Sequence, residues 1–184
     1  MKPTEKLSKE HEAILTMTGI LIRLADRLET GAPVDPNDID RMLAFIHDFA
    51  QKSHRTKEEN YLFPALAKAG LDQDHGPIDM MLAEHAASRT SAEAMARAVP
   101  GLRTGDEHAA AAFAAAARRY GDVLAMHMAK EDRILYPLAN ARLTSDEQAA
   151  LEKGFAEVEE AAVGGGLREE YCRLLNRLER TYLI

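Results

Sequence analysis

The chain has 184 residues, a formal net charge of −7 and one cysteine, Cys172. This length indicates one domain, and a single cysteine excludes an internal disulfide and a cysteine-rich zinc module. An acidic balance without a Lys/Arg-rich block argues against nucleic-acid binding, and no apolar run reaches the roughly 18 residues that suggest a membrane span. The charged start of the chain lacks the apolar stretch of a secretory signal. We therefore expect a cytoplasmic protein.

The composition is that of a helical protein. Ala and Leu supply 53 of the 184 residues, whereas Val, Ile and Thr together supply 22. Ala and Leu lose little conformational freedom in a helix, while β-branched side chains are restricted there. The chain is therefore expected to consist of helices joined by short turns.

The first predicted helix spans about residues 4–29 and the second about residues 36–70. Their inward positions recur at steps of three and four, the pattern of a buried helical face. Asp35-Pro36 is a typical helix start, and Pro64 should kink the second helix or tighten its last turn. The inward positions are Leu7, His11, Ile14, Thr18, Leu21, Ala25 and Leu28 in the first helix, and Ile39, Leu43, Ile46, Ala50, His54, Glu58, Tyr61 and Ala65 in the second.

The third predicted helix opens at Gly76-Pro77 and closes at Pro100-Gly101, and the fourth spans about residues 104–141. Their inward positions are Ile78, Met81, Leu82, His85, Arg89 and Ala92 in the third helix, and Phe113, Ala117, Tyr120, Leu124, His127, Glu131, Ile134 and Leu138 in the fourth. Thr144 with Glu147 predicts the capped start of a fifth helix, which runs to about residue 162. A short amphipathic helix over about residues 167–182 follows.

Four long helices with short turns predict an all-α fold, an antiparallel up-down-up-down four-helix bundle with additional C-terminal helices. An internal repeat supports this prediction. HRTKEENYLFP (54–64) aligns with HMAKEDRILYP (127–137), and Glu10-His11 is matched by Glu84-His85. The bundle is thus expected to be two similar helix pairs related by an approximate two-fold axis. We assign residues 1–142 to the bundle and 143–184 to a helical extension packed on the same domain.

Each bundle helix carries one histidine on its inward face, and two helices add a glutamate four residues later. Residues i and i+4 lie on one face of a helix, so each such pair can direct two ligands at one point. An ionised carboxylate in a bundle core is costly unless it is paired or binds a metal. A metal centre satisfies the whole set, which is His11, His54, Glu58, His85, His127 and Glu131.

The ligand types indicate which metals suit this centre. Imidazole and carboxylate ligands without thiolate suit iron or manganese, with zinc as another option. Four histidines and two glutamates divide evenly between two metals, about 3.5–4 Å apart, if both glutamates bridge. By repeat symmetry we expect His11 and His54 on one metal and His85 and His127 on the other. Open positions would remain for an oxo or hydroxo bridge and a small exogenous molecule.

The charged neighbours of the ligands are expected to face solvent. Lys57 and Lys130 should extend to solvent beside the bundle. Glu59 and Asp132 should lie on the solvated face, with support of the ligands as the alternative.

Other side chains near the ligands receive structural interpretations. Tyr61 and Tyr120 should pack in the core, the alternative being that either phenol hydrogen-bonds a metal-bound oxygen. His47 should be half-buried, the alternative being that it lines an entry path. His75 and His108 are expected at the surface, and the methionines expected in the core are Met81, Met126 and Met128.

At these residues the sequence resembles the hemerythrin-like, HHE cation-binding family. The motifs are His11, HRTKEENYLFP, the GPIDMMLAEH segment that ends at His85, and HMAKEDRILYP, and the resemblance covers roughly residues 5–142. It implies a non-haem di-iron centre in an up-down-up-down bundle. The third helix has one ligand-type histidine, and Glu131 follows His127 by four residues. This pattern is similar to that of the symmetric four-histidine, two-glutamate members rather than the oxygen carriers.

The resemblance implies a protein that binds or senses dioxygen, related small molecules or iron. An enzyme that reduces peroxide or nitric oxide at the same centre is the first alternative, because an open di-iron site permits both. A structural or metal-storage bundle is the second. The expected partner is a small molecule such as dioxygen, peroxide or nitric oxide, with neither nucleic acid nor membrane involved.

Overall fold

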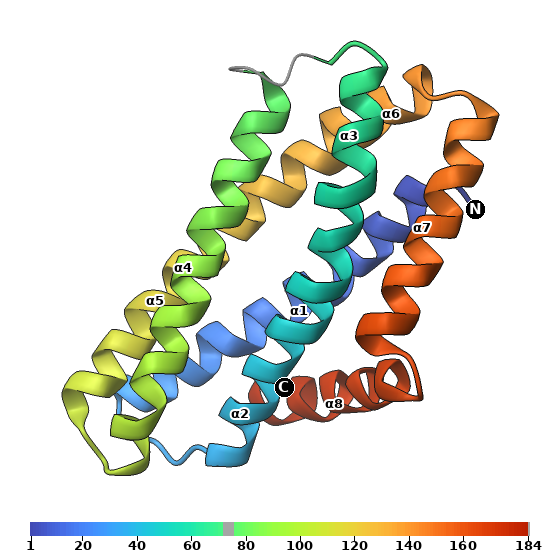
Figure 1. Ribbon diagram of the computed structural model, residues 1–184. Coiled ribbons are helices and arrows are strands. Elements are labelled where there is room, and N and C mark those ends of the chain that lie inside the picture. Colours follow the sequence, from blue (N-terminus) through green and yellow to red (C-terminus); the bar gives the residue numbers. More distant parts are fainter. Residues whose placement is uncertain (72–75, 184) are drawn as a thin grey trace.

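The computed structural model describes residues 1–71 and 76–183, and every regular element in these residues is a helix (Figure 1). Four long helices run alternately up and down, which confirms the predicted bundle. The first is α1 (Pro3–Glu29) and the third is α4 (Pro77–Arg103). The second helix comprises α2 (Pro36–Phe45), η1 (Ile46–Arg55), η2 (Glu58–Leu62) and α3 (Phe63–Lys68), and the fourth comprises α5 (Glu107–Lys130), η3 (Glu131–Leu135) and α6 (Tyr136–Arg142).

Two further helices, α7 (Ser145–Val163) and α8 (Leu167–Tyr182), follow the bundle. In Figure 1, α7 runs beside the bundle and α8 crosses one end of it. Tyr171 of α8 donates a hydrogen bond to Asp48, and Tyr182 donates one to the buried Asp38. These contacts fix α8 across the end of the bundle where the second helix begins.

The helix starts follow from local capping. Asp35 accepts a hydrogen bond from the backbone N–H of Asn37, and Pro36 occupies the first helical position. Thr144 and Glu147 form the predicted capping box at the start of α7.

The end of α4 differs from the prediction. Pro100 lies inside the helix, which continues to Arg103 instead of closing at Pro100-Gly101. A Cβ atom built on Gly101 would lie 2.5 Å from the Cβ of Ala109 in α5. Gly101 therefore allows α4 and α5 to pack closely, and it does not mark the end of α4.

Three of the helical segments are π-helical, and two of these shift the buried face by one residue. The turns η2 and η3 lie 73 residues apart, at equivalent places in the repeat. Each adds a residue before a proline, and a proline has no N–H for the α-helical hydrogen bond. The buried positions after the turns are therefore Leu62, Leu66, Leu135 and Ala139. The sequence periodicity predicted Tyr61, Ala65, Ile134 and Leu138, one residue earlier, and Ile134 is in fact 62% exposed.

Three other predicted inward positions are also wrong. Leu82 and Arg89 are exposed on α4, where Ser88 and Ser91 are buried instead. Met126 is exposed, whereas Met81 and Met128 are buried as expected. The Ala-rich helices α4 and α5 pack closely against each other. Fewer positions around each helix are therefore buried than the sequence pattern predicted.

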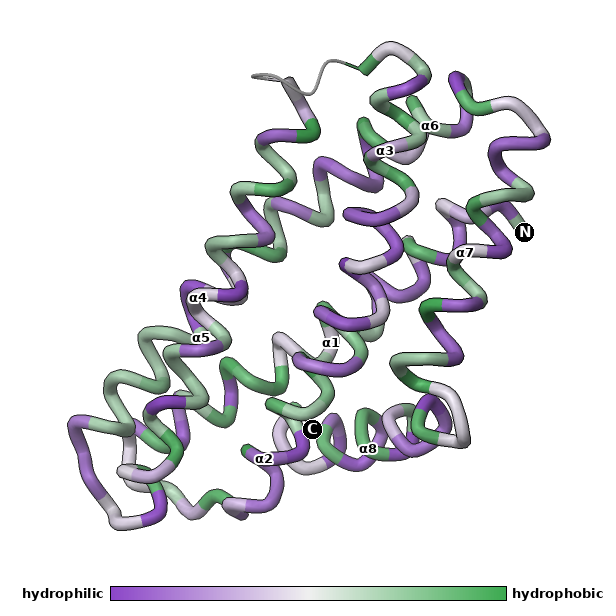
Figure 2. Tube along the Cα trace, viewed as in Figure 1, coloured by the Kyte–Doolittle hydropathy of each residue, from purple (hydrophilic) through white to green (hydrophobic). Residues whose placement is uncertain are grey.

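Two hydrophobic clusters make up the core of the described residues. The larger cluster surrounds Leu21, Met42 and Phe113 and includes Leu178 of α8, while the smaller surrounds Leu7, Leu62 and Leu135 and includes Phe155 of α7. Figure 2 shows apolar residues recurring along each helix, as an amphipathic bundle requires. The buried histidines and glutamates belong to neither cluster. Within residues 1–71 and 76–183, the helices lack the long apolar stretch needed to cross a bilayer.

A glycine lets α7 pack on the bundle, which yields a first prediction. A Cβ atom on Gly154 would lie 2.1 Å from the ring of Tyr61, whereas one on Gly19 of α1 would meet nothing within 4 Å. Gly154→Ala should therefore lower the free energy of unfolding by about 1–3 kcal/mol through overpacking. Gly19→Ala should raise it by up to about 1 kcal/mol through helix propensity. Denaturant melts of both variants test this, and equal stabilisation would contradict the close contact with Tyr61.

Candidate metal centre

The six residues singled out by the sequence come together inside the bundle. None is more than 4% exposed. Their potential ligand atoms form two groups, each with all atoms within 4.8 Å of one another. One group is His11, His54, Glu58 and Glu131, and the other is Glu58, His85, His127 and Glu131. Each group could hold one metal ion, and both glutamates belong to both groups.

Each glutamate lies between two histidines from different helices. Glu58 Oε2 is 3.6 Å from His54 Nε2, one turn away on the same helix, and 3.3 Å from His85 Nε2 on α4. Glu131 is 3.2 Å from His127 Nε2 on its own helix and 3.3 Å from His11 Nε2 on α1. A carboxylate placed between two sets of imidazoles has the position of a bridging ligand.

The inward-facing atoms of this set are poorly satisfied by the protein itself. Among the described residues, His54 Nε2, Glu58 Oε2 and both carboxylate oxygens of Glu131 make no hydrogen bond. His85 Nε2 and His127 Nε2 face each other at 3.0 Å. Buried acceptors without donors are costly, and two imidazole nitrogens aimed at one point suit a shared cation. The residues present therefore fit a pair of metal ions.

A carboxylate lies beside the outer nitrogen, Nδ1, of every one of the four histidines. At His54, His85 and His127 the contact is a hydrogen bond, which fixes the ring orientation and tautomer and directs Nε2 towards the centre, as is usual for metal-binding histidines. At His11 it is a close ion-pair contact without hydrogen-bond geometry. The Nδ1–oxygen distances are 3.1 Å for His11 with Asp132, 3.0 Å for His54 with Glu10, 2.7 Å for His85 with Glu59, and 3.0 Å for His127 with Glu84.

These four carboxylates correct the sequence interpretation. Glu59 and Asp132 were expected on the solvated face, with support of the ligands as the alternative. Asp132 is exposed and Glu59 is half-buried, and each contacts a histidine as that alternative predicted. Glu10 and Glu84 were noted as part of the repeat, and no role was predicted for them. Each comes directly before one histidine and contacts the histidine of the next helix. Their recurrence in both repeats was the available signal, because a purely solvated position needs no such repetition.

The two lysines of the repeat pair with two of these carboxylates. Lys57 bonds Glu10 and is fully buried, so the expectation that it extends to solvent is wrong. Glu159 of α7 lies 3.9 Å from the Lys57 ammonium, so α7 covers this face of the bundle. Lys130 bonds Glu84 in the equivalent arrangement, and its side chain is 28% exposed. Lys57 and Lys130 are equivalent in the repeat, but only Lys57 is covered by the C-terminal helix α7.

The buried charges shift the pKa values at this centre. Burial disfavours the charged imidazole of His11, but Asp132 and Glu131 outweigh this and raise its pKa to about 10. Burial also opposes charge on His85, and Glu58 and Glu59 outweigh it and raise the pKa of His85. Burial would raise the pKa of Glu131, but His11 and His127 hold it well below its ordinary value. Without metal, a proton on His11 therefore offsets part of the carboxylate charge.

Tyr136 is a site neighbour that sequence analysis missed. Its hydroxyl donates to Glu58 Oε1 at 2.5 Å and lies 3.1 Å from His11 Nε2, and its ring stacks on His11. The equivalent residue of the first repeat is Phe63, which stacks on His85. In both repeats an aromatic residue comes directly before the proline, and this recurrence was the feature of the sequence that could have revealed it. The π-helical turn before that residue directs its side chain towards the centre.

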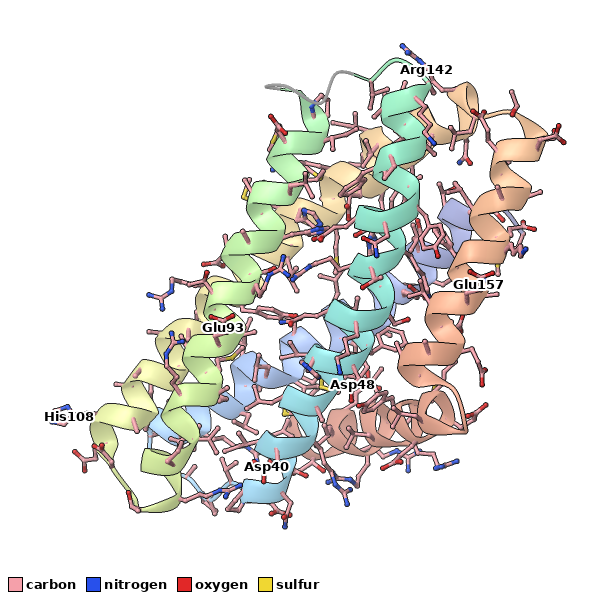
Figure 3. The ribbon with its side chains drawn as sticks, in the orientation of Figure 1. Asp40, Asp48, Glu93, His108, Arg142 and Glu157 are labelled. Atoms are coloured by element: carbon pink, nitrogen blue, oxygen red, sulfur yellow. The ribbon has the colours of Figure 1, made fainter. Side chains whose placement is uncertain are left out.

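The remaining sequence expectations have mixed outcomes. Tyr61 is only half-buried and packs on Phe155, while Tyr120 is buried beside the histidines. The side chain of His47 is 58% exposed and contacts Asp48, so the half-buried interpretation is wrong. His108 projects from the bundle as expected (Figure 3). His75 lies outside the described residues.

A family model for the hemerythrin HHE cation-binding domain matches residues 2–139. The chain belongs to this family. The match spans the whole hemerythrin bundle up to α6, and α7 and α8 lie beyond it. The family is named for cation binding, and this chain has two buried His/Glu groups that could each hold a metal ion. No curated protein and no solved structure is significantly similar to the chain.

The raised pKa of His11 predicts that metal uptake releases protons. A metal-binding imidazole must be neutral, and His11 with a pKa of about 10 is charged at pH 7. Binding should therefore release about one proton from His11, and affinity should rise with pH from 7 to 9. Calorimetric zinc titrations in buffers of different ionisation enthalpy measure this release. Asp132→Asn removes a carboxylate that raises this pKa, so the variant should release fewer protons than the wild type at pH 9, where His11 is close to its pKa; equal release at that pH would contradict the assignment.

Proposed function

We propose that this hemerythrin-family chain is a di-iron protein that binds or senses dioxygen, related small molecules or iron itself. One observation carries the proposal: two buried four-residue groups share Glu58 and Glu131. Among the described residues, His54 Nε2, Glu58 Oε2 and both Glu131 carboxylate oxygens in these groups make no hydrogen bond. His11 and His54 would hold one metal, and His85 and His127 the other. The two glutamates would bridge.

The ligand chemistry supports iron. Imidazole and carboxylate without thiolate suit iron or manganese, with zinc as another option. Two bound iron ions supply the redox and Lewis-acid chemistry that binding of dioxygen requires.

The protein's own part is to orient the ligands and exclude water. The carboxylates at Nδ1 hold the four rings, and burial of all six residues keeps the centre dry. With four imidazoles and two carboxylates shared by two ions, each ion keeps coordination positions for a small molecule.

Tyr136 favours a second candidate function, the reduction of peroxide or nitric oxide. Its buried hydroxyl lies within hydrogen-bond distance of Glu58 and His11. Burial, together with the charges of Glu131 and Glu58, raises the pKa of Tyr136 well above its ordinary value, so the phenol keeps its proton. A neutral phenol beside the centre can donate a hydrogen bond to a reacting oxygen and so orient it.

Anaerobic iron loading followed by exposure to oxygen tests the main proposal. We expect about two irons per chain and a visible absorption band that appears on oxygen exposure. A turnover assay with hydrogen peroxide and with nitric oxide separates the two candidates. Multiple turnovers would establish the enzyme, whereas stoichiometric binding supports the carrier or sensor. One iron or none per chain after careful loading would contradict the di-iron centre.

The shared glutamates predict an asymmetry among ligand variants. Glu58→Ala and Glu131→Ala each remove a ligand from both ions and leave the repulsion between the ions less compensated, so occupancy should fall towards zero. His11→Ala and His85→Ala each remove a ligand from one ion, so about one metal should stay. The exposed His47→Ala is the control and should keep two. Metal per chain under identical loading is the measurement, and glutamate variants that keep two metals would refute the bridging assignment.

A further inference from the structure

Three cations from different helices meet at Glu159 of α7. Its carboxylate forms ion pairs with Lys6 of α1 and Arg168 of α8, and it lies 3.9 Å from the ammonium of Lys57 in the second bundle helix. The side chain of Glu159 is only 17% exposed. One largely buried carboxylate of the C-terminal extension is therefore in contact with two bundle helices and with α8.

The contacts of Glu159 continue inwards to a histidine of the candidate metal centre. Lys57 is fully buried and bonds Glu10, and Glu10 accepts a hydrogen bond from His54 Nδ1 at 3.0 Å. Glu159, Lys57, Glu10 and His54 thus form one line of contacts from α7 to the centre. The proposed function uses the inner part of this line and assigns no role to α7.

The internal repeat contains the inner part of this line twice and the outer part once. Lys130 bonds Glu84, and Glu84 forms a hydrogen bond with His127 Nδ1, as in the first half. Across residues 1–71 and 76–183, no second carboxylate pairs with Lys130. Its ammonium instead lies 3.5 Å from the sulfur of Met80, which is the repeat-equivalent of Lys6. Only one of the two equivalent histidines is therefore connected to the C-terminal extension.

Loss of the Glu159 charge would change the balance around Glu10. Glu10 acts electrostatically on Lys6 as well as on Lys57, and Lys6 and Arg168 both act on Lys57. Three cations therefore share two carboxylates. Because Glu10 is only 2% exposed, little water can replace a missing carboxylate there. Without Glu159, the three cations would draw Glu10 away from its histidine.

We propose that Glu159 is a positioning residue for the candidate metal centre, which fixes His54 through Lys57 and Glu10 and so strengthens one metal site of the pair. This inference rests on the proposed function, because it needs both metal sites. It gives a role to α7, which lies beyond the residues matched by the family model. Partners that orient a metal-binding histidine typically contribute about 10–100-fold to metal affinity. Since Glu159 acts through two further side chains, we expect about three- to tenfold.

Zinc titrations of chains that keep one ion each test the inference. His85→Ala leaves the site of His11 and His54, and His11→Ala leaves the site of His85 and His127. Added Glu159→Gln should raise the Kd for zinc about three- to tenfold in the His85→Ala chain and leave it unchanged in the His11→Ala chain. Competition with a zinc-sensitive dye measures each Kd.

Glu157→Gln is the matched control, because it removes the same charge from the same helix. Glu157 is exposed on α7 (Figure 3), and it makes no ion pair within the described part of the chain. This variant should leave both Kd values unchanged, which excludes a general effect of charge on zinc affinity. Equal rises of the two Kd values in Glu159→Gln would mean that Glu159 only packs α7 on the bundle, and would overturn the inference.

Metal content of the wild-type chain separates the possible failures. If the wild type binds two zinc ions and Glu159→Gln leaves the Kd of the His85→Ala chain unchanged, the inference falls and the metal centre stands. A wild-type chain that takes up neither zinc nor iron overturns both. If the His85→Ala chain holds no zinc, a two-step titration of the chain with all six ligands decides. Glu159→Gln should then weaken the first step and not the second, and an unchanged first step overturns the inference.

Discussion

The structure depends on holding a layer of ionisable side chains inside an apolar bundle. Two glutamates and four histidines lie between the two hydrophobic clusters, and each histidine is held from behind by a carboxylate. Two of those carboxylates are held in turn by Lys57 and Lys130. Each buried charge is thus set against another, from the centre outwards to the edge of the bundle. The helices can pack as they do only because these contacts offset much of the cost of burying the charges.

The repeat supplies this layer twice, and the departures from the repeat are where the two sides of the centre differ. Tyr136 corresponds to Phe63 in the repeat. Glu58 therefore accepts a phenolic hydrogen bond, and Glu131 has no equivalent one. Arg55 corresponds to Met128 in the repeat, so a buried guanidinium in one half has a buried apolar side chain as its counterpart in the other. The extension α7 covers Lys57 but leaves its equivalent partly exposed. The six residues of the candidate metal centre are thus arranged nearly symmetrically, but their surroundings differ between the two halves of the repeat.

The fold and the six candidate ligands were predictable because helical periodicity and the i, i+4 spacing are local properties. Errors arose where the structure departs from a regular helix or where a distant segment intervenes. The π-helical turns moved burial from Tyr61 to Leu62 and from Ile134 to Leu135, since one added residue turns the helix by about 100°. The burial of Lys57 depends on α7, about a hundred residues later in the chain. Arg55 directly follows a predicted ligand, but nothing in the local sequence shows that its guanidinium is buried and donates to Ser88 of α4.

The depth of the centre also governs how fast metal can enter and leave. All six candidate ligands are at least 96% buried, so no ion reaches them by diffusion through the closed bundle. Exchange has to wait for the helices to part locally, and the free energy of that opening enters both the loading and the release rates. The smaller hydrophobic cluster has fewer residues to separate than the larger one, which α8 reinforces. A chain built in this way would retain bound ions kinetically, even when a competing chelator would win at equilibrium.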